Sequence, residues 1–397
     1  MKKGINKFLV AGVIIGMIFS LAGIALVAQA KSEPMERKIV VFQPWFVNES
    51  AKDELISRFG GAEIKNLDLI GGMAVYLPPK AEEALSKRTE VLRIDDDVII
   101  EALRKPAPVQ PAETLPWGVD RIDAEKVWGI TTGDPIKVAI VDTGIDLTHP
   151  DLKDNIKGGV STVLYTISYN DDNGHGTHVA GIVAAIDNEI GVIGVGPKID
   201  FYVVKVLDRR GSGYLSDVIE GLDWAIKNGM QIVNMSFGTS SYNASLEDAI
   251  KKVNAAGIVQ VAAAGNSGPG DNTVSYPAKF AEVIAVTATD QTDTIASWSS
   301  RGSEVDLAAP GVDIYSTYKG STYKTLSGTS MAAPHVTGTA ALVLTTAIGG
   351  YDLDGDGLWD PNEVQNRLEA TAKDLGVVGW DNLYGSGLVN AYSAVTE

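Results

Sequence analysis

The chain has 397 residues, of which 45% are hydrophobic and 21% are charged, and it contains no cysteine. This composition is globular, with room for two or three domains, and it excludes disulfide frameworks, cysteine-ligated metal sites and thiol nucleophiles. The 50 acidic residues outnumber the 33 basic ones and give a net charge of −17. Such a charge argues against nucleic acid or anionic lipid as a partner and is compatible with bound cations such as calcium.

The first 30 residues predict a secretory signal peptide. Three lysines within the first seven residues precede an apolar run, 8–27, which is followed by an Ala-Gln-Ala cleavage site at 28–30. A retained membrane anchor is the alternative, because the run approaches the ~20 residues that span a bilayer. The cleavage site and the lack of a second apolar span favour the signal peptide. We therefore expect a secreted protein with no membrane attachment after its removal.

Residues 31–103 predict a small domain. Strand-like and helix-like patterns alternate between Arg37 and Leu103 in the order β-α-β-β-α-β, which is that of a ferredoxin-like fold. The first helix is expected over 50–59 with Ser50 as its N-cap. Residues 104–114 carry three prolines and are expected to form an extended linker.

Residues 115–397 predict a larger domain. Short apolar strand patterns, beginning with 137–141, alternate with helical patterns. Continuous apolar strands between helices indicate a parallel sheet that is covered on both faces. We therefore expect an α/β fold with a doubly wound, mostly parallel sheet, in which functional groups follow the carboxyl ends of strands.

Three short motifs bring Asp, His and Ser to such positions. Asp142-Thr-Gly follows the first strand directly, His175-Gly-Thr-His178 begins a helical pattern, and Gly328-Thr-Ser330-Met-Ala begins another. A serine hydroxyl needs an adjacent base to act as a nucleophile, and a histidine held by a carboxylate is such a base. Each motif alone could be an ordinary turn or cap. Together they predict a catalytic triad of Asp142, His175 and Ser330.

The three motifs closely resemble the signatures of the subtilase family, and the resemblance covers nearly all of the chain after Arg37. It implies a monomeric serine endopeptidase that cleaves proteins through an acyl-enzyme. It also implies that Asn266 donates to the oxyanion, and that residues 31–103 are a propeptide that acts as an intramolecular inhibitor. A catalytically inactive binding module of the same fold is the alternative, and the presence of all four catalytic residues disfavours it.

The resemblance further implies a substrate cleft. Two glycine-containing segments match edge strands that pair with peptide substrates, and other residues match the walls of two apolar pockets. The residues implied are Gly211, Ser212, Gly213, Leu215, Ser236, Phe237, Gly238, Ala264, Gly265 and Ser275. The first pocket has no acidic residue, so a broad preference for apolar or aromatic P1 residues is expected. With Leu103 in that pocket, the first self-cleavage is expected at the Leu103–Arg104 bond.

Residues 352–363 match the EF-hand calcium loop, D-x-D-x-D-G-x₅-E, at every patterned position. The expected ligands are Asp352, Asp354, Asp356, Leu358 through its carbonyl, and Glu363. The alternative is an acidic turn in which Asp360 and Glu363 cap a helix, and both interpretations can hold at once. The helix that starts at Pro361 is expected to be the last of the chain and to end near Lys373.

A second calcium site follows from the resemblance alone. Its ligands would be side chains and backbone carbonyls of Glu113, Asp151, Ile186, Asn188, Ile190 and Val192. The remaining histidines (His149, His178 and His335) are interpreted as packing or turn residues. A zinc pair of His175 and His178 is possible on spacing alone, but the sequence offers no third ligand.

Overall fold

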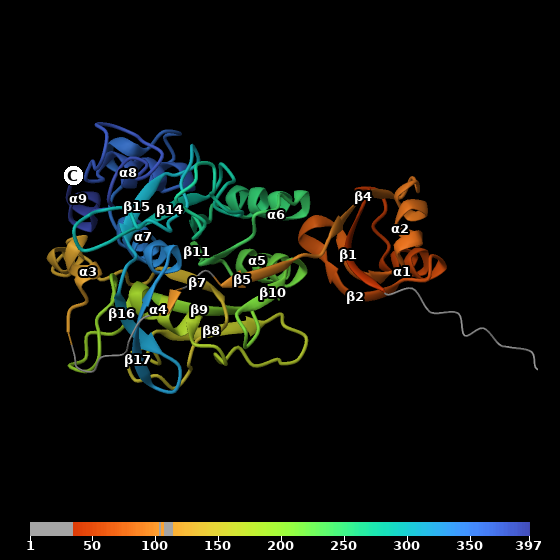
Figure 1. The fold of residues 1–397 in the computed structure, drawn as a ribbon, viewed down its shortest axis with the longest axis horizontal. Helices are drawn as coiled ribbons and strands as arrows, with labels where there is room; N and C mark the ends of the chain where they lie inside the picture. The colour runs from red at the N-terminus through yellow and green to blue at the C-terminus, as the bar shows by residue number, and fades with distance from the viewer. Residues whose placement is uncertain (1–34, 103–104, 107–113) are drawn as a thin grey trace, which may run out of the picture. The chain divides into compact units, whose positions relative to one another are not determined.

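A parallel sheet of seven strands lies at the centre of residues 114–397 in the computed structural model, which describes residues 35–102, 105–106 and 114–397 (Figure 1). Its strand order is β15-β14-β13-β11-β7-β9-β8. The strands are β7 (Lys137–Asp142), β8 (Ile156–Ser161), β9 (Asp200–Lys205), β11 (Ile232–Met235), β13 (Val259–Ala263), β14 (Ile284–Thr289) and β15 (Leu307–Pro310). All of their pairings are parallel, as expected for this fold class.

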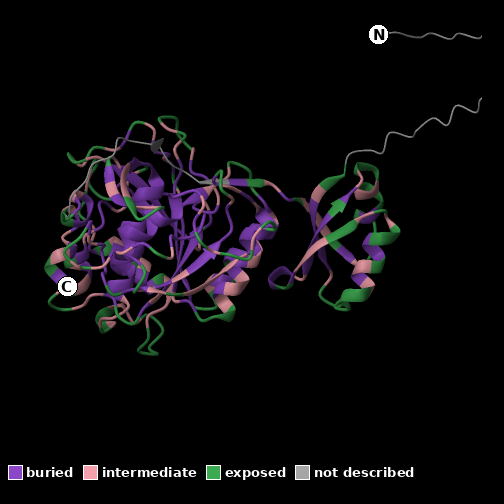
Figure 2. Cartoon of the chain, turned by 90° about the horizontal axis from the view of Figure 1, so that it is seen from below, coloured by how far each residue is buried: buried purple, intermediate pink, exposed green. Residues whose placement is uncertain are grey.

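Helices cover both faces of this sheet. Helices α4 (His175–Ala184) and α7 (Thr329–Val343) pack on one face, while α5 (Leu215–Lys227) and α6 (Ala244–Ala255) pack on the other. Alternate residues of a strand point to opposite faces, so Val138 of β7 packs with the first pair and Ala139 with the second. Figure 2 shows that the buried residues concentrate in the sheet and in the helix faces against it. The doubly wound α/β fold is confirmed.

The C-terminal region differs from the expectation in one respect. Helix α8 (Pro361–Ala370) ends before Lys373, and a further helix, α9 (Ala391–Thr396), follows it. Lys373 instead exchanges two backbone hydrogen bonds with Leu388, which ends the helical pattern. Elsewhere in residues 114–397, a short helix, α3 (Trp117–Arg121), precedes β7, and β16 (Ile314–Tyr318) and β17 (Thr322–Ser327) form an antiparallel hairpin.

Residues 36–96 form a separate antiparallel sheet in the order β2-β3-β1-β4. The strands are β1 (Glu36–Phe42), β2 (Ala62–Leu67), β3 (Gly72–Leu77) and β4 (Val91–Asp96), and the helices between them are α1 (Glu49–Arg58) and α2 (Pro79–Ser86). These strands and helices share a buried apolar cluster of their own. The N-cap of α1 is Asn48 and not Ser50, because the Asn48 side chain accepts the Ala51 N–H at 2.9 Å.

Two short strands follow this sheet along the chain and belong to two further three-stranded sheets, and residues 35–397 form one compact unit. Strand β5 (Ile99–Ala102) pairs with β10 (Ser212–Tyr214) and with β12 (Phe237–Gly238), and β6 (Lys105–Pro106) pairs with β17. The proposed signal peptide, 1–30, and most of the proposed linker lie outside the described residues. Over the described ranges, no helix is both long and apolar enough to cross a membrane.

Candidate active site

Asp142 and His175 form a buried pair at the carboxyl edge of the sheet. Asp142 is the last residue of β7, and His175 is the first residue of α4. His175 Nδ1 lies 2.8 Å from both carboxylate oxygens of Asp142, and both side chains are fully buried. The Thr143 N–H donates to Asp142 Oδ1 at 2.6 Å. A carboxylate beside Nδ1 favours the tautomer with the proton on that atom, and Nε2 has no hydrogen-bond partner among the described residues.

Ser330 is the second residue of α7 and is also fully buried. Its hydroxyl donates to the carbonyl oxygen of Ser236 at 2.9 Å and not to His175. The helix N-terminus leaves backbone N–H groups unpaired, which suits the stabilisation of a developing negative charge.

Asn266 follows β13 and faces the start of α7. Its Oδ1 accepts hydrogen bonds from the Thr329 N–H at 3.0 Å and from the Thr329 hydroxyl at 3.1 Å. Because Thr329 holds the Asn266 oxygen in this way, the N–H groups of the Asn266 side-chain amide point away from Thr329. The preceding Gly265 has φ +115°, and a Cβ there would lie 2.6 Å from Ser275 Oγ, so this turn requires glycine.

Strand β5 lies between the two segments that the sequence implicates in substrate binding. Gly213 of β10 is in register with Ile100, and Phe237 of β12 with Ala102, both antiparallel. Leu103 and Arg104 lie outside the described residues, and the chain reappears at β6, where Lys105 pairs with Ser327. Strand β5 is therefore paired on both of its edges by the segments that the sequence predicts to bind substrate. Gly211 (φ +80°) makes the turn before β10.

The predicted pocket residues lie beside this strand. Leu215 is fully buried and shares an apolar cluster with Ile100. Ser275 is also buried, and its N–H donates to the Ala264 carbonyl at 2.8 Å, which brings these two residues and Gly265 together.

The other histidines have structural contacts. His178 Nε2 contacts the carbonyl oxygens of Ile314 and Lys324, and burial lowers its pKa to about 3. Burial also lowers the pKa of His335 to about 4, and its Nδ1 lies 2.8 Å from the Met331 carbonyl. His149 Nε2 lies 3.0 Å from the Thr322 carbonyl. The Nε2 atom of His178 is therefore directed at two backbone carbonyls.

Lys205 is a residue of the site that the sequence analysis missed. It is fully buried, and its ammonium group donates to Thr143 O at 2.6 Å, to Leu207 O at 3.0 Å and to Asp172 Oδ1 at 2.7 Å. It thus connects the turn after Asp142 with the loop before α4. The available signal was a lysine within the apolar strand pattern 201–206.

The acidic loop 352–363 brings three carboxylates together. Ligand oxygens of Asp352, Asp354 and Asp356 lie within 4.8 Å of one another. Gly357 has φ +77°, as a sharp turn at the sixth position requires. Glu363 is buried and accepts the Leu353 N–H at 2.7 Å and the Asp360 N–H at 2.8 Å, so the capping box of α8 is also present. The three clustered aspartates fit calcium, whereas the predicted ligands Leu358 and Glu363 are not part of this cluster.

The second predicted calcium site also has a suitable oxygen ligand. Asp151 is fully buried; its Oδ2 accepts from the Val192 N–H and the Tyr323 hydroxyl, while its Oδ1 has no partner among the described residues. A buried carboxylate oxygen without a donor fits a cation. Asn188 Oδ1 accepts the Ile190 N–H, and Ile186 donates its N–H to Asp151 O. Glu113 lies outside the described residues.

A buried Asp–His pair at the carboxyl end of a strand in a doubly wound sheet, together with a serine at a helix N-terminus, is typical of a serine hydrolase. Residues 133–387 match the sequence model of the Subtilase family. The chain belongs to this family.

Several relatives extend the match. The chain is 41% identical over 406 residues to the alkaline protease of Alkalihalobacillus alcalophilus, which covers 99% of this chain and all of that protein. It is 49% identical over 284 residues to Subtilisin Savinase of Lederbergia lenta, covering 71% of this chain and 99% of the relative. The thermostable alkaline protease of Halalkalibacterium halodurans is 41% identical over 379 residues, covering 94% of this chain and 97% of that protein. The chain is therefore a serine endopeptidase, and its substrates are proteins.

Proposed function

We propose that this protein is a secreted, calcium-stabilised endopeptidase that is made as a self-processing zymogen. The observation that carries the proposal is strand β5, which lies in antiparallel register between β10 and β12; this pairing supports a substrate-like role for the segment. The signal-peptide pattern of residues 1–30 supports secretion. The alkaline protease relatives support the peptidase activity.

In the proposed acylation step, the Ser330 hydroxyl turns from Ser236 to His175. His175 Nε2 takes the hydroxyl proton while Oγ attacks the scissile carbonyl carbon. The negative charge on the carbonyl oxygen is stabilised by the Asn266 amide and the Ser330 N–H. Asp142 keeps the imidazole in the required tautomer and stabilises its protonated form.

The tetrahedral intermediate then breaks down. The C–N bond cleaves, His175 gives its proton to the leaving amine, and an ester between Ser330 and the acyl group remains. A water molecule gives a proton to His175 and attacks the ester, and the carboxylic acid product leaves as Ser330 regains its proton.

Residues 31–103 are proposed to remain as a product-like inhibitor after the cut at Leu103–Arg104. Their strand β5 keeps its pairing with the cleft, and Leu103 would fill the first pocket, which Ala264, Gly265 and Ser275 border. The same pocket would select apolar or aromatic P1 residues in other substrates.

Calcium is proposed to stabilise the fold through the two sites described above. Bound in loop 352–363, it would offset repulsion among the clustered carboxylates, and at Asp151 it would satisfy the unpaired Oδ1. The proposed catalytic residues are not ligands in either site.

The test is a comparison of the wild-type protein with Ser330→Ala. The wild type should cut its own precursor and react at Ser330 with a serine-directed phosphonate, as intact mass would report, whereas Ser330→Ala should do neither. Ser303→Ala, at an exposed serine, is the matched control and should behave as wild type. An unlabelled, uncut wild-type protein would favour the inactive binding module.

A further inference from the structure

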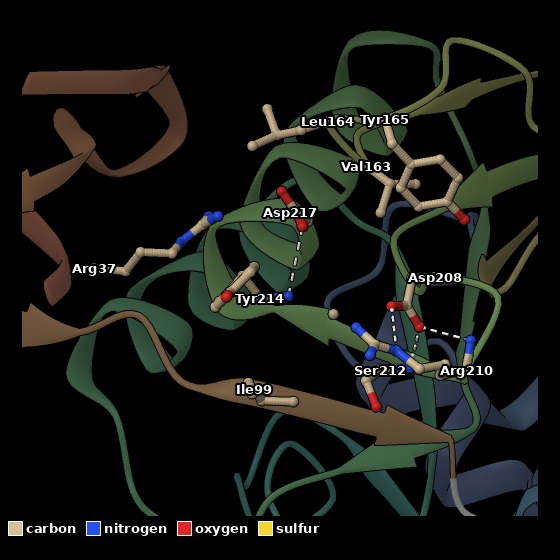
Figure 3. Close-up of a pocket in the computed structure, with 11 residues that line it drawn as sticks. Arg37, Ile99, Val163, Leu164, Tyr165, Asp208, Arg210, Ser212, Tyr214 and Asp217 are labelled. Atoms are coloured by element: carbon tan, nitrogen blue, oxygen red, sulfur yellow. Dashed lines mark hydrogen bonds and ion pairs between the residues drawn. The ribbon is translucent and has the colours of Figure 1, made fainter. Parts of the chain in front are cut away.

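Arg37, at the start of β1, lies against the N-terminus of α5. Its guanidinium carbon is 3.4 Å from the centroid of the Tyr214 ring, and Nη2 donates to Ser216 Oγ at 2.9 Å. Figure 3 shows Arg37 extending toward Tyr214 and Asp217 beside a cavity that Ile99 also lines. The cavity has a volume of about 160 Å³. A cation therefore occupies the aromatic face next to the cleft.

Lys65, in β2, places a second cation on the same helix. Its ammonium group is 2.5 Å from Asp217 Oδ1 and 2.7 Å from Glu220 Oε2, and it donates to the Thr162 carbonyl at 2.9 Å. The Asp217 side chain is only 2% exposed. In the described part of the chain, Lys65 is the ion-pair partner of both acids.

Both cations belong to the segment that the proposed function removes. The acids and the tyrosine remain on α5 and at its N-cap, so release of residues 31–103 would leave Asp217 and Glu220 without Lys65. An acidic group next to an aromatic face attracts arginine and lysine through charge and cation–π contacts. Arg37 and Lys65, which residues 31–103 supply, indicate that this surface accepts arginine and lysine side chains.

We propose that Tyr214, Asp217 and Glu220 form a cation subsite in the processed enzyme, which binds an arginine or lysine of a protein substrate upstream of the apolar pocket at Leu215. The inference rests on the proposed release of residues 31–103. Tyr214 pairs with Ile99 in the antiparallel register, so the subsite is within reach of substrate residues that bind where Ile99 and the residues just before it lie. It would add a charge preference to a cleft whose first pockets are apolar.

The test uses the processed wild-type enzyme and two internally quenched peptides. Both peptides carry the sequence of residues 100–103 followed by the same leaving segment; upstream, one has three arginines and the other three glutamines. The arginine peptide should have a kcat/KM about 3- to 10-fold higher at low ionic strength, mainly through a lower KM, given the usual strength of exposed ion pairs and cation–π contacts. The preference should shrink in 0.5 M NaCl because salt screens the charges.

Variants assign the preference to these residues. Asp217→Asn and Glu220→Gln should each reduce the arginine preference while cleaving the glutamine peptide as wild type does. Glu220 is partly exposed, so its variant remains informative if Asp217→Asn fails to fold. Asp223→Asn is the matched control, because it removes the same charge from α5 at a residue that pairs with Lys227.

Two results would count against the subsite. Equal kcat/KM values for the two peptides, or an arginine preference that survives in Asp217→Asn and Glu220→Gln, would overturn it and leave the peptidase assignment intact. If neither peptide is cleaved, the proposed function itself fails, and the subsite with it.

Discussion

Ile100 lies directly opposite Gly213 in antiparallel register, and its side chain is 1% exposed within the apolar cluster that contains Leu215. Glycine at position 213 lets β10 pack closely on the segment that follows β9, because a Cβ on Gly213 would lie 2.2 Å from the Val206 carbonyl oxygen. Strand β5 is therefore held by both its backbone pairing and a buried side chain. This combination is what a product-like inhibitor requires.

The first prediction concerns the position of the self-cleavage. If Ile100 fills the pocket at Leu215, the first cut should fall three residues further on, between Leu103 and Arg104. N-terminal sequencing of freshly processed protein should therefore find Arg104, before any trimming of the proline-rich segment. Leu103→Asp should slow processing, because a carboxylate would be desolvated in an apolar pocket. A first cut within 37–98 would show that the register is wrong.

Asn266→Ala should lower kcat by about 10²- to 10³-fold, the loss typical of an oxyanion-hole donor in this family, with little change in KM. The Oδ1 of Asn266 also accepts two hydrogen bonds from Thr329, so Asn266→Asp is a useful second variant. It keeps the acceptor but lacks the N–H donor, and it should lose as much activity. Full activity in Asn266→Asp would exclude the proposed role.

Lys205→Met should lower kcat about tenfold or more, because it removes the hydrogen bonds to Thr143 and Asp172 that join the Asp142 turn to the loop before His175. Lys205 acts here as a positioning residue, and it touches neither substrate nor the reacting atoms. Asp172→Asn keeps an acceptor for the ammonium group and should cost much less. The value of kcat, measured on the folded fraction of Lys205→Met, distinguishes a positioning role from a role in stability only. A lower melting temperature with unchanged kcat would mean that Lys205 serves stability only.

The pH dependence of stability should carry a contribution from Asp306. Burial raises its pKa to about 7, the nearby Glu369 adds to this effect, and the hydrogen bond from the Ala285 N–H opposes it. An unfolded chain ionises this group near its ordinary pKa of 3.8, so the folded state holds the extra proton between about pH 4 and 7. Stability should therefore fall as pH rises through this window.

Asp306→Asn lacks this ionisation. The melting temperature of this variant minus that of the wild type, measured in buffers of equal ionic strength, should increase from pH 4 to pH 7. Above pH 7 the difference should be constant. Glu369→Gln should shift the window to lower pH. Parallel curves for wild type and Asp306→Asn would contradict the assignment.

The predicted positions of Asp142, His175 and Ser330 at a strand end and two helix starts agree with the structure, because such positions follow from chain pattern alone. Asn48 and Ser50 show the limit: both are good N-cap residues two positions apart, and only backbone geometry distinguishes them. Lys205 was missed because its three acceptors come from separate segments. Ion pairs such as Lys65 with Asp217, 152 residues apart in the chain, likewise depend on how β2 packs against α5.

The last prediction concerns calcium in loop 352–363. The loop connects α7, which carries Ser330, to α8, and it holds three carboxylates within 4.8 Å in a chain that is already strongly negative. A cation that binds only the folded state adds about 2.7 kcal/mol at 100 times its Kd, a sizeable part of the ~5–15 kcal/mol that stabilises a typical domain. Asp356→Ala should therefore lower the melting temperature in calcium and make it less sensitive to EDTA. Turnover at moderate temperature should stay near the wild-type value, because Asp142, His175, Asn266 and Ser330 lie outside the loop.

Asp271→Ala, which removes the same charge from an exposed residue elsewhere, should leave the calcium response unchanged. A loss of turnover with an unaltered melting temperature, or undiminished calcium binding by Asp356→Ala, would refute a purely structural role for this site.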